Sequence, residues 1–98
     1  MKLLTKALRV KLPKLYEQEK LGEDAIVYCK FFVPWNSWKW YVTEFDGEDI
    51  CFGKVVGLET ELGYFSLKEL SEIKGPGGLR IERDMWFKPC KIKDVKNV

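Results

Sequence analysis

The side chains best suited to contacting a partner lie in the middle of the chain, around an expected turn. Trp35, Trp38 and Trp40 fall within six residues, and Lys39 separates the last two. Exposed tryptophans supply contact area at protein interfaces and stacking platforms for single-stranded nucleic acid. Strand alternation places Trp38 and Trp40 on one face, which is either the core face or an exposed one. We therefore expect a partner-binding surface here, with Trp35 as the most exposed indole.

Two arginines further along the chain extend this set. Arg80 follows a glycine-rich loop at residues 75–78, and Arg83 lies between Glu82 and Asp84. A guanidinium fork suits carboxylates and phosphates. The loop lacks the G-K-[ST] ending of a phosphate-binding loop, which favours a plain turn. The predicted partner-binding residues are thus Trp35, Trp38, Lys39, Trp40, Arg80 and Arg83.

The residue types that most enzymes and metal sites need are sparse. The chain has no histidine, which excludes Ser-His and Cys-His nucleophilic systems and every His-ligated metal. Carboxylates gather at residues 44–49, but they lack the calcium-loop pattern with its terminal bidentate Glu. We predict no catalytic residue, no metal site and no cofactor. The remaining enzymatic alternative is a metal-dependent hydrolase that uses Glu44, Asp46, Glu82 and Asp84.

Cysteine usage indicates the compartment. Cys29, Cys51 and Cys90 are odd in number and widely spaced, unlike a disulfide framework or a set of paired zinc ligands. A thiol inside an apolar run acts as a small hydrophobe. The charged N-terminus is followed by no apolar signal region, and no apolar run is long enough to span a membrane. These features predict a soluble, cytoplasmic protein.

The charge balance restricts the partner. Formal net charge is +2, so that no global field steers the chain to nucleic acid or to an anionic membrane. We therefore predict a non-enzymatic binding protein with a protein partner and no membrane partner. The basic excess of both ends, together with Trp35, Trp38 and Lys39, keeps nucleic-acid binding as the alternative.

Runs of aromatic and β-branched residues predict the strands that position these side chains. Turn signals such as Asp46-Gly47 join the runs closely, which favours antiparallel pairing because parallel pairs need long crossovers. The expected strands span residues 26–33, 38–45 and 50–58, with a short strand at 63–65 and a weaker fifth at 79–87.

Two helices complete the expected fold. A leucine stripe predicts a helix near residues 5–12, which Pro13 ends. Ser66 and Glu69 match a capping box, which predicts a helix near residues 67–74.

The whole chain, residues 1–98, is long enough for one domain. We expect an α+β fold, in which an antiparallel meander of four to five strands carries both helices on one face. Residues 88–98 are expected to form a basic C-terminal tail of low order. The expected core comprises Leu8, Leu12, Phe31, Tyr41, Phe45, Phe65, Leu67 and Leu70.

A long string of motifs resembles a known family. The matching segments are Lys30-Phe31-Phe32, Trp38 to Gly47, Phe52-Gly53, Gly57-Leu58-Glu59, Glu61 to Leu70 and Gly78 to Asp84. With the leading Leu-Leu-Thr-Lys segment, they resemble a bacterial and phage domain of unknown function, number 2958. The resemblance implies an accessory gene of a phage, plasmid or other mobile element, found among anti-restriction-type genes. It thus implies a small protein that acts on a host or element partner, with counter-defence as one such role.

Overall fold

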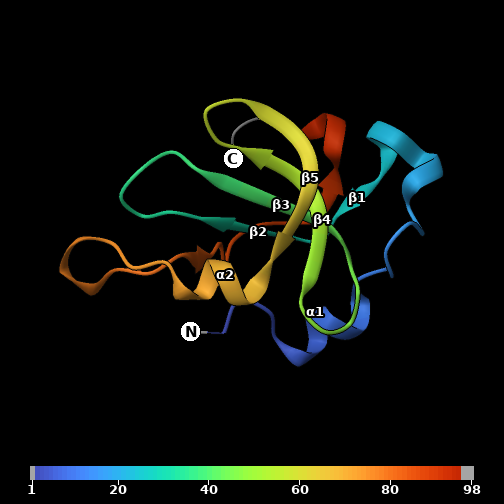
Figure 1. The fold of residues 1–98 in the computed structure, drawn as a ribbon. Helices are drawn as coiled ribbons and strands as arrows, with labels where there is room; N and C mark the ends of the chain where they lie inside the picture. Colours follow the sequence, from blue (N-terminus) through green and yellow to red (C-terminus); the bar gives the residue numbers. More distant parts are fainter. Residues whose placement is uncertain (1, 96–98) are drawn as a thin grey trace.

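The computed structural model describes residues 2–95 and is built on a five-stranded antiparallel sheet (Figure 1). The strand order is β5–β4–β3–β2–β6, so that four consecutive strands form a meander. The predicted α+β class and the antiparallel sheet are confirmed. The strands are β2 (Cys29–Phe32), β3 (Lys39–Phe45), β4 (Ile50–Val56), β5 (Thr60–Ser66) and β6 (Glu82–Arg83).

The first expected strand, residues 26–33, is divided at Tyr28. Its beginning, β1 (Ile26–Val27), pairs with β7 (Cys90–Lys91) in a separate two-stranded sheet, whereas β2 pairs with β3 and β6. A run of β-branched and aromatic residues carries no signal for a change of pairing partner. The prediction of one continuous strand was therefore wrong.

The last two strands of the large sheet also differ in length from the prediction. β5 begins at Thr60, three residues before the short strand expected at 63–65, because a shorter loop joins it to β4. β6 contains only two of the residues expected in a strand at 79–87, and it pairs with the end of β2.

The two α-helices lie where the sequence predicts helices. α1 (Lys6–Lys11) and α2 (Leu67–Glu72) are both short. The side-chain oxygens of Thr5 and Ser66 cap them by accepting the backbone N–H groups of Leu8 and Glu69. No helix among the described residues is long and apolar enough to cross a membrane.

The C-terminal segment packs against the rest of the domain as far as the structure describes it. β7 is followed by a 3-10 helix, η3 (Ile92–Asp94), and Ile92 and Val95 are buried. Residues 96–98 of the expected tail lie outside the described residues. Two apolar residues between lysines form too short a pattern to predict this packing from the sequence.

Buried side chains form two clusters. Phe31, Trp40 and Val42 belong to a cluster with Leu67 and Leu70 of α2, against which Leu8 of α1 packs. A second, smaller cluster contains Val27, Tyr41, Ile92 and Val95. Because Tyr41 lies between Trp40 and Val42 in β3, the two clusters occupy opposite faces of the sheet. Of the expected core, all members are buried except Leu8 and Phe65, which are half-buried.

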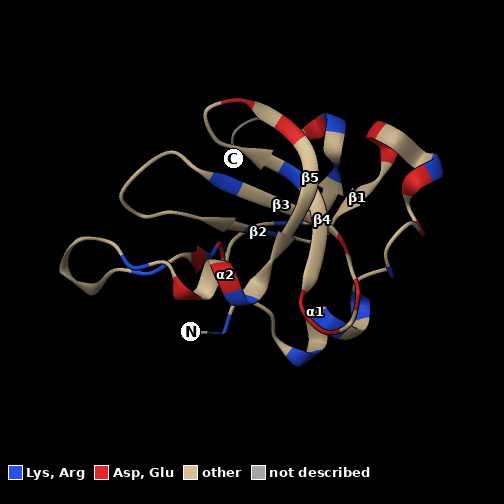
Figure 2. Cartoon of the chain, viewed as in Figure 1, with Lys and Arg blue, Asp and Glu red and all other residues tan. Residues whose placement is uncertain are grey.

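Charged residues are distributed unevenly over the elements (Figure 2). α1 contains three basic residues and no acidic one. A second 3-10 helix, η1 (Glu19–Asp24), contains three acidic residues and one lysine. Glu59 and Glu61 lie at the hairpin between β4 and β5. Acidic groups therefore lie on η1 and near the start of β5, and also at the turn between β3 and β4, which contains Asp46, Glu48 and Asp49.

Candidate functional site

The tryptophans of the predicted contact surface lie in three different environments. Trp40 is 6% exposed and belongs to the core, so that it is not available to a partner. Trp35 is half-buried, and its ring covers Gly75, where an added Cβ would lie 2.5 Å from a ring carbon. Trp38 is 37% exposed, and its ring packs against the Trp40 ring with the two centroids 6.0 Å apart and the planes tilted by 37°. The expectation that Trp35 is the most exposed indole of this set was wrong, because Trp38 is more exposed. Trp86, which lies outside the set, is 90% exposed.

The cationic residues of that prediction are held by local contacts. The Arg83 guanidinium donates to the backbone oxygens of Lys2 and Leu3, both at 2.9 Å, and ties the N-terminal segment to β6. Arg80 donates to the backbone oxygen of Ser71 near the end of α2 at 3.0 Å. Lys39 is half-buried at the start of β3. Arg83 thus has a structural role in the fold.

The carboxylates of the hydrolase alternative are not assembled into one metal site. Asp46 accepts the N–H groups of Glu48 and Asp49, and these hydrogen bonds hold the pKa of its carboxyl below the usual range. Asp84 pairs with Lys30 at 3.7 Å beside β6. Within residues 2–95, no group of three or more His, Cys, Asp or Glu side chains could hold a metal ion.

The cysteines are not set up as nucleophiles. Cys29 and Cys51 are buried, and Cys90 is partly buried. Burial raises the pKa of the Cys29 thiol to about 12 and raises the pKa of the Cys51 thiol as well. A protonated, buried thiol is inert.

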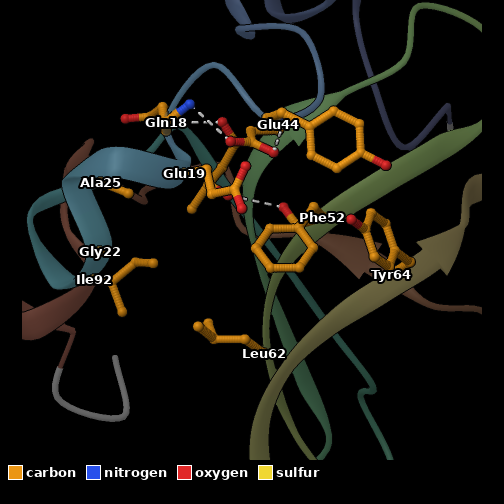
Figure 3. Close-up of a pocket in the computed structure, with 11 residues that line it drawn as sticks. Gln18, Glu19, Gly22, Ala25, Glu44, Phe52, Leu62, Tyr64 and Ile92 are labelled. Carbon is orange, nitrogen blue, oxygen red and sulfur yellow. Dashed lines mark hydrogen bonds between the residues drawn. The ribbon is translucent and has the colours of Figure 1, made fainter.

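A pocket of about 180 Å³ lies on the face of the sheet that carries Tyr41 (Figure 3). Phe52, Leu62 and Tyr64 from β4 and β5 line one side of it. Gly22 of η1 and Ile92 of η3 line the other side. Glu44, from the end of β3, completes the wall.

A bulge in β3 places Glu44 in this pocket. Val42 pairs with Gly53 and Glu44 pairs with Phe52, so that Thr43 is an extra residue in the strand. The bulge reverses the alternation that follows it and moves Phe45 into the cluster with Trp40. Strict alternation along the expected strand at residues 38–45 places Phe45 on the same face as Tyr41, and the bulge overturns that placement.

The chain that follows α1 crosses the end of β3 and encloses the Glu44 carboxylate. Glu44 is 4% exposed, and its two oxygens accept the backbone N–H groups of Tyr16 and Gln18, each at 2.8 Å. Tyr16 has a φ of 74°, which is the only positive φ among the described non-glycine residues. A non-glycine residue in this region costs on the order of 1–3 kcal/mol, which the surrounding contacts must offset.

Gln18 completes this buried polar network. Its side-chain amide donates to the backbone oxygens of Ile26 and Thr43, and its side-chain oxygen accepts the Ile26 N–H at 2.7 Å. Every buried side-chain polar atom within residues 2–95 has a hydrogen-bond partner. The carboxylate is therefore held in a rigid frame.

The rim of the pocket exposes apolar and aromatic side chains. Tyr16, Leu62 and Tyr64 are 62%, 56% and 54% exposed. The Phe52 and Tyr64 rings are tilted by 59° with centroids 4.9 Å apart. The pKa of Tyr64 is raised, first by its interaction with the Tyr16 side chain across the rim.

Sequence reasoning missed most of this site. Glu44 was considered only with the carboxylates of the following turn. Leu62 lay outside the expected strand at 63–65, so that its position on the same strand face as Tyr64 was not predicted. Gln18 and Tyr16 carry no local signal, because their roles depend on contacts with β3.

Comparison with known proteins gives a family but no activity. The family model described as "Protein of unknown function (DUF2958)" matches residues 3–93. No curated protein and no solved structure matches the chain. The match covers almost all of the sequence and confirms the resemblance of the motif string. The chain therefore belongs to the DUF2958 family of proteins of unknown function.

Proposed function

We propose that this protein is a non-enzymatic binding protein and that the pocket beside Glu44 is the centre of its binding surface. One observation carries the proposal: a rigidly held carboxylate lines a pocket whose rim leaves large apolar side chains exposed. Leu62 and Tyr64 neighbour the pocket on β5, and Tyr16 faces them from the segment before η1. Binding energy at interfaces concentrates in such pockets, with apolar residues around them that exclude water.

The size of the pocket indicates what it accepts. Its volume of about 180 Å³ compares with a cavity of about 150 Å³ that accommodates benzene. One side chain of a partner protein therefore fits, and the exposed rim contacts the residues around it. The lining residues include no histidine, cysteine or lysine, and both Glu44 oxygens already accept hydrogen bonds. These properties favour recognition over proton transfer or nucleophilic attack.

The biological setting is part of the proposal. We propose a protein partner from a mobile genetic element or its host, with counter-defence as one such role; the family resemblance motivates this context. A cytoplasmic location agrees with the free thiols of Cys29, Cys51 and Cys90.

Nucleic-acid binding is the alternative proposal, favoured by a second depression of about 620 Å³. Its lining includes the cations Lys2, Lys6, Arg9 and Lys68, but also two acidic residues and no tryptophan. The stacking residues expected beside these cations are thus not among its lining residues. Affinity for a single-stranded oligonucleotide that falls steeply with salt would favour this alternative.

Partner capture tests the main proposal. Tagged wild-type protein, Tyr64→Ala and Leu58→Ala are each used to capture proteins from the native host, and the captured proteins are identified. Leu58 is 95% exposed at the β4–β5 hairpin and does not line the pocket, so that it is the matched control. We expect Tyr64→Ala to weaken capture by about tenfold or more, with an unchanged melting temperature, whereas Leu58→Ala captures normally. Equal capture by Tyr64→Ala and wild type would contradict the proposal.

A further inference from the structure

We propose that the pocket selects a positively charged side chain of its partner, of the arginine or lysine type. This inference rests on the proposed function, because it names what enters the same pocket.

The first argument is the charge of Glu44. A buried carboxylate is costly unless a cation pairs with it or several donors bind it. Among residues 2–95, only the two backbone N–H groups of Tyr16 and Gln18 donate to Glu44, and no lysine or arginine of this part of the chain lies at ion-pair distance from it. A carboxylate has about four acceptor positions, so that two donors leave capacity for a third and a fourth. A cationic side chain that enters the pocket would donate hydrogen bonds to these unused acceptor positions of Glu44.

The second argument is the aromatic lining. Phe52 and Tyr64 stand at 59° to each other with centroids 4.9 Å apart, and Tyr16 also lines the pocket. Faces of aromatic rings attract cations, and cages of tilted rings bind ammonium groups. An apolar lining also suits the methylene stem of Arg or Lys, which packs on apolar surface while its head meets a charge.

The third argument is the field around the pocket. Glu19 lines the pocket, and Glu23 lies on the same 3-10 helix. Glu59 lies just before β5, where Figure 2 shows acidic residues, whereas Glu61 pairs with Val55 and its side chain points to the other face of the sheet. Lys54 pairs with Leu62 across the β4–β5 ladder but does not line the pocket. Grouped acidic residues lower the potential at the entrance and favour the approach of a cation.

Other ligand classes fit less well. Calcium and magnesium require six or more oxygen ligands, and the described residues contain no cluster that could hold a metal. An anion would meet two carboxylates, Glu19 and Glu44, with no basic side chain in the lining.

The test compares two probes that share a side-chain shape and differ in charge, N-acetyl-arginine amide and N-acetyl-citrulline amide. Binding is followed by NMR in the full-length protein through the backbone amides of Tyr16 and Gln18, which donate to Glu44. We expect saturable shifts with the arginine probe and at least about fivefold weaker binding of the citrulline probe. Equal affinities, or no shift with either probe, would overturn the inference.

Two variants locate the effect. Glu19→Gln removes an exposed charge from the lining, and Tyr64→Ala removes a ring that is 54% exposed, so that neither change threatens the fold. We expect both to weaken arginine binding by about twofold to tenfold, with Leu58→Ala unchanged. Arginine binding that neither variant weakens would also overturn the inference.

A third probe separates this inference from the proposed function. If N-acetyl-leucine amide shifts the same two amides as strongly as the arginine probe, charge selection fails while the pocket remains a binding site. Loss of partner capture in Tyr64→Ala tests the proposed function independently of any probe.

Discussion

One extra residue in β3 decides which face of the sheet Glu44 occupies. Without the bulge at Thr43, Glu44 would point into the cluster with Val42, among apolar side chains. With it, the carboxylate meets the backbone N–H groups of Tyr16 and Gln18 on the other face. The pocket therefore depends on a small set of residues that hold one another in place.

Replacing Glu44 tests this dependence. Glu44→Ala leaves the buried N–H of Gln18 and the part-buried N–H of Tyr16 without an acceptor, and a buried unsatisfied donor costs about 1–3 kcal/mol. We therefore expect the free energy of unfolding, measured by urea denaturation, to fall by about 2–5 kcal/mol. Glu61→Ala, at an exposed position of β5, should change it by less than about 0.5 kcal/mol. Similar small losses in both variants would show that Glu44 does not organise the segment that crosses β3.

At the scale of elements, the four-stranded meander depends on how closely β3 and β4 approach. Gly53 faces the Tyr41 carbonyl of the neighbouring strand, and a Cβ at this position would overlap that backbone oxygen. Gly63, directly opposite in β5, has no neighbouring atom within 4 Å of an added Cβ. Two glycines that pair with each other thus have different roles.

The two glycines form a matched pair of variants. Gly53→Ala should destabilise the protein by about 2 kcal/mol or more in urea denaturation, because a backbone carbonyl cannot move aside as a flexible side chain can. Gly63→Ala should be neutral or stabilising by up to about 1 kcal/mol, because alanine loses less backbone entropy in a strand. A Gly53→Ala variant as stable as Gly63→Ala would contradict the close approach of the two strands.

Elements with a strong local pattern were predictable from the sequence. The strands around Trp40 and Phe52 are rich in aromatic and β-branched residues, and the caps Thr5 and Ser66 mark both α-helices. Features that depend on distant contacts were not predictable. The change of partner at Tyr28 and the bulge at Thr43 arise from pairing with residues far along the chain, which no local pattern records. Most of the candidate site belongs to this second class.

At the scale of the whole molecule, the C-terminal segment covers the face of the sheet that carries Tyr41. Val27 and Tyr41 have no exposed surface, and Ile92 and Val95 are the apolar residues packed with them. Lys93 and Lys91 pair with Asp24 of η1, with the closer ion pair at 2.9 Å. This segment joins η1 to the second cluster and so supports the wall of the pocket that Gly22 and Ile92 form.

The second cluster predicts that Ile92, which lies between two lysines in the sequence, contributes strongly to the stability of the fold. Ile92→Ala removes buried methyl groups and should lower the free energy of unfolding by about 2–4 kcal/mol. Lys93→Ala removes one exposed, solvent-screened ion pair and should lower the free energy of unfolding much less. Thermal and urea denaturation measure both, and an Ile92→Ala variant no less stable than Lys93→Ala would show that the segment does not pack on Tyr41.

The central claim is that the pocket beside Glu44 contacts the partner, and an NMR interface map tests it most directly. Isotope-labelled protein is titrated with the captured partner, and the change at each backbone amide is recorded. The largest changes are predicted at Tyr16, Gln18, Leu62 and Tyr64, while Trp86 stays unchanged. Changes concentrated instead around Trp38 and Lys39, or around the basic depression that includes Arg9, would contradict the claim and move the binding surface to that region.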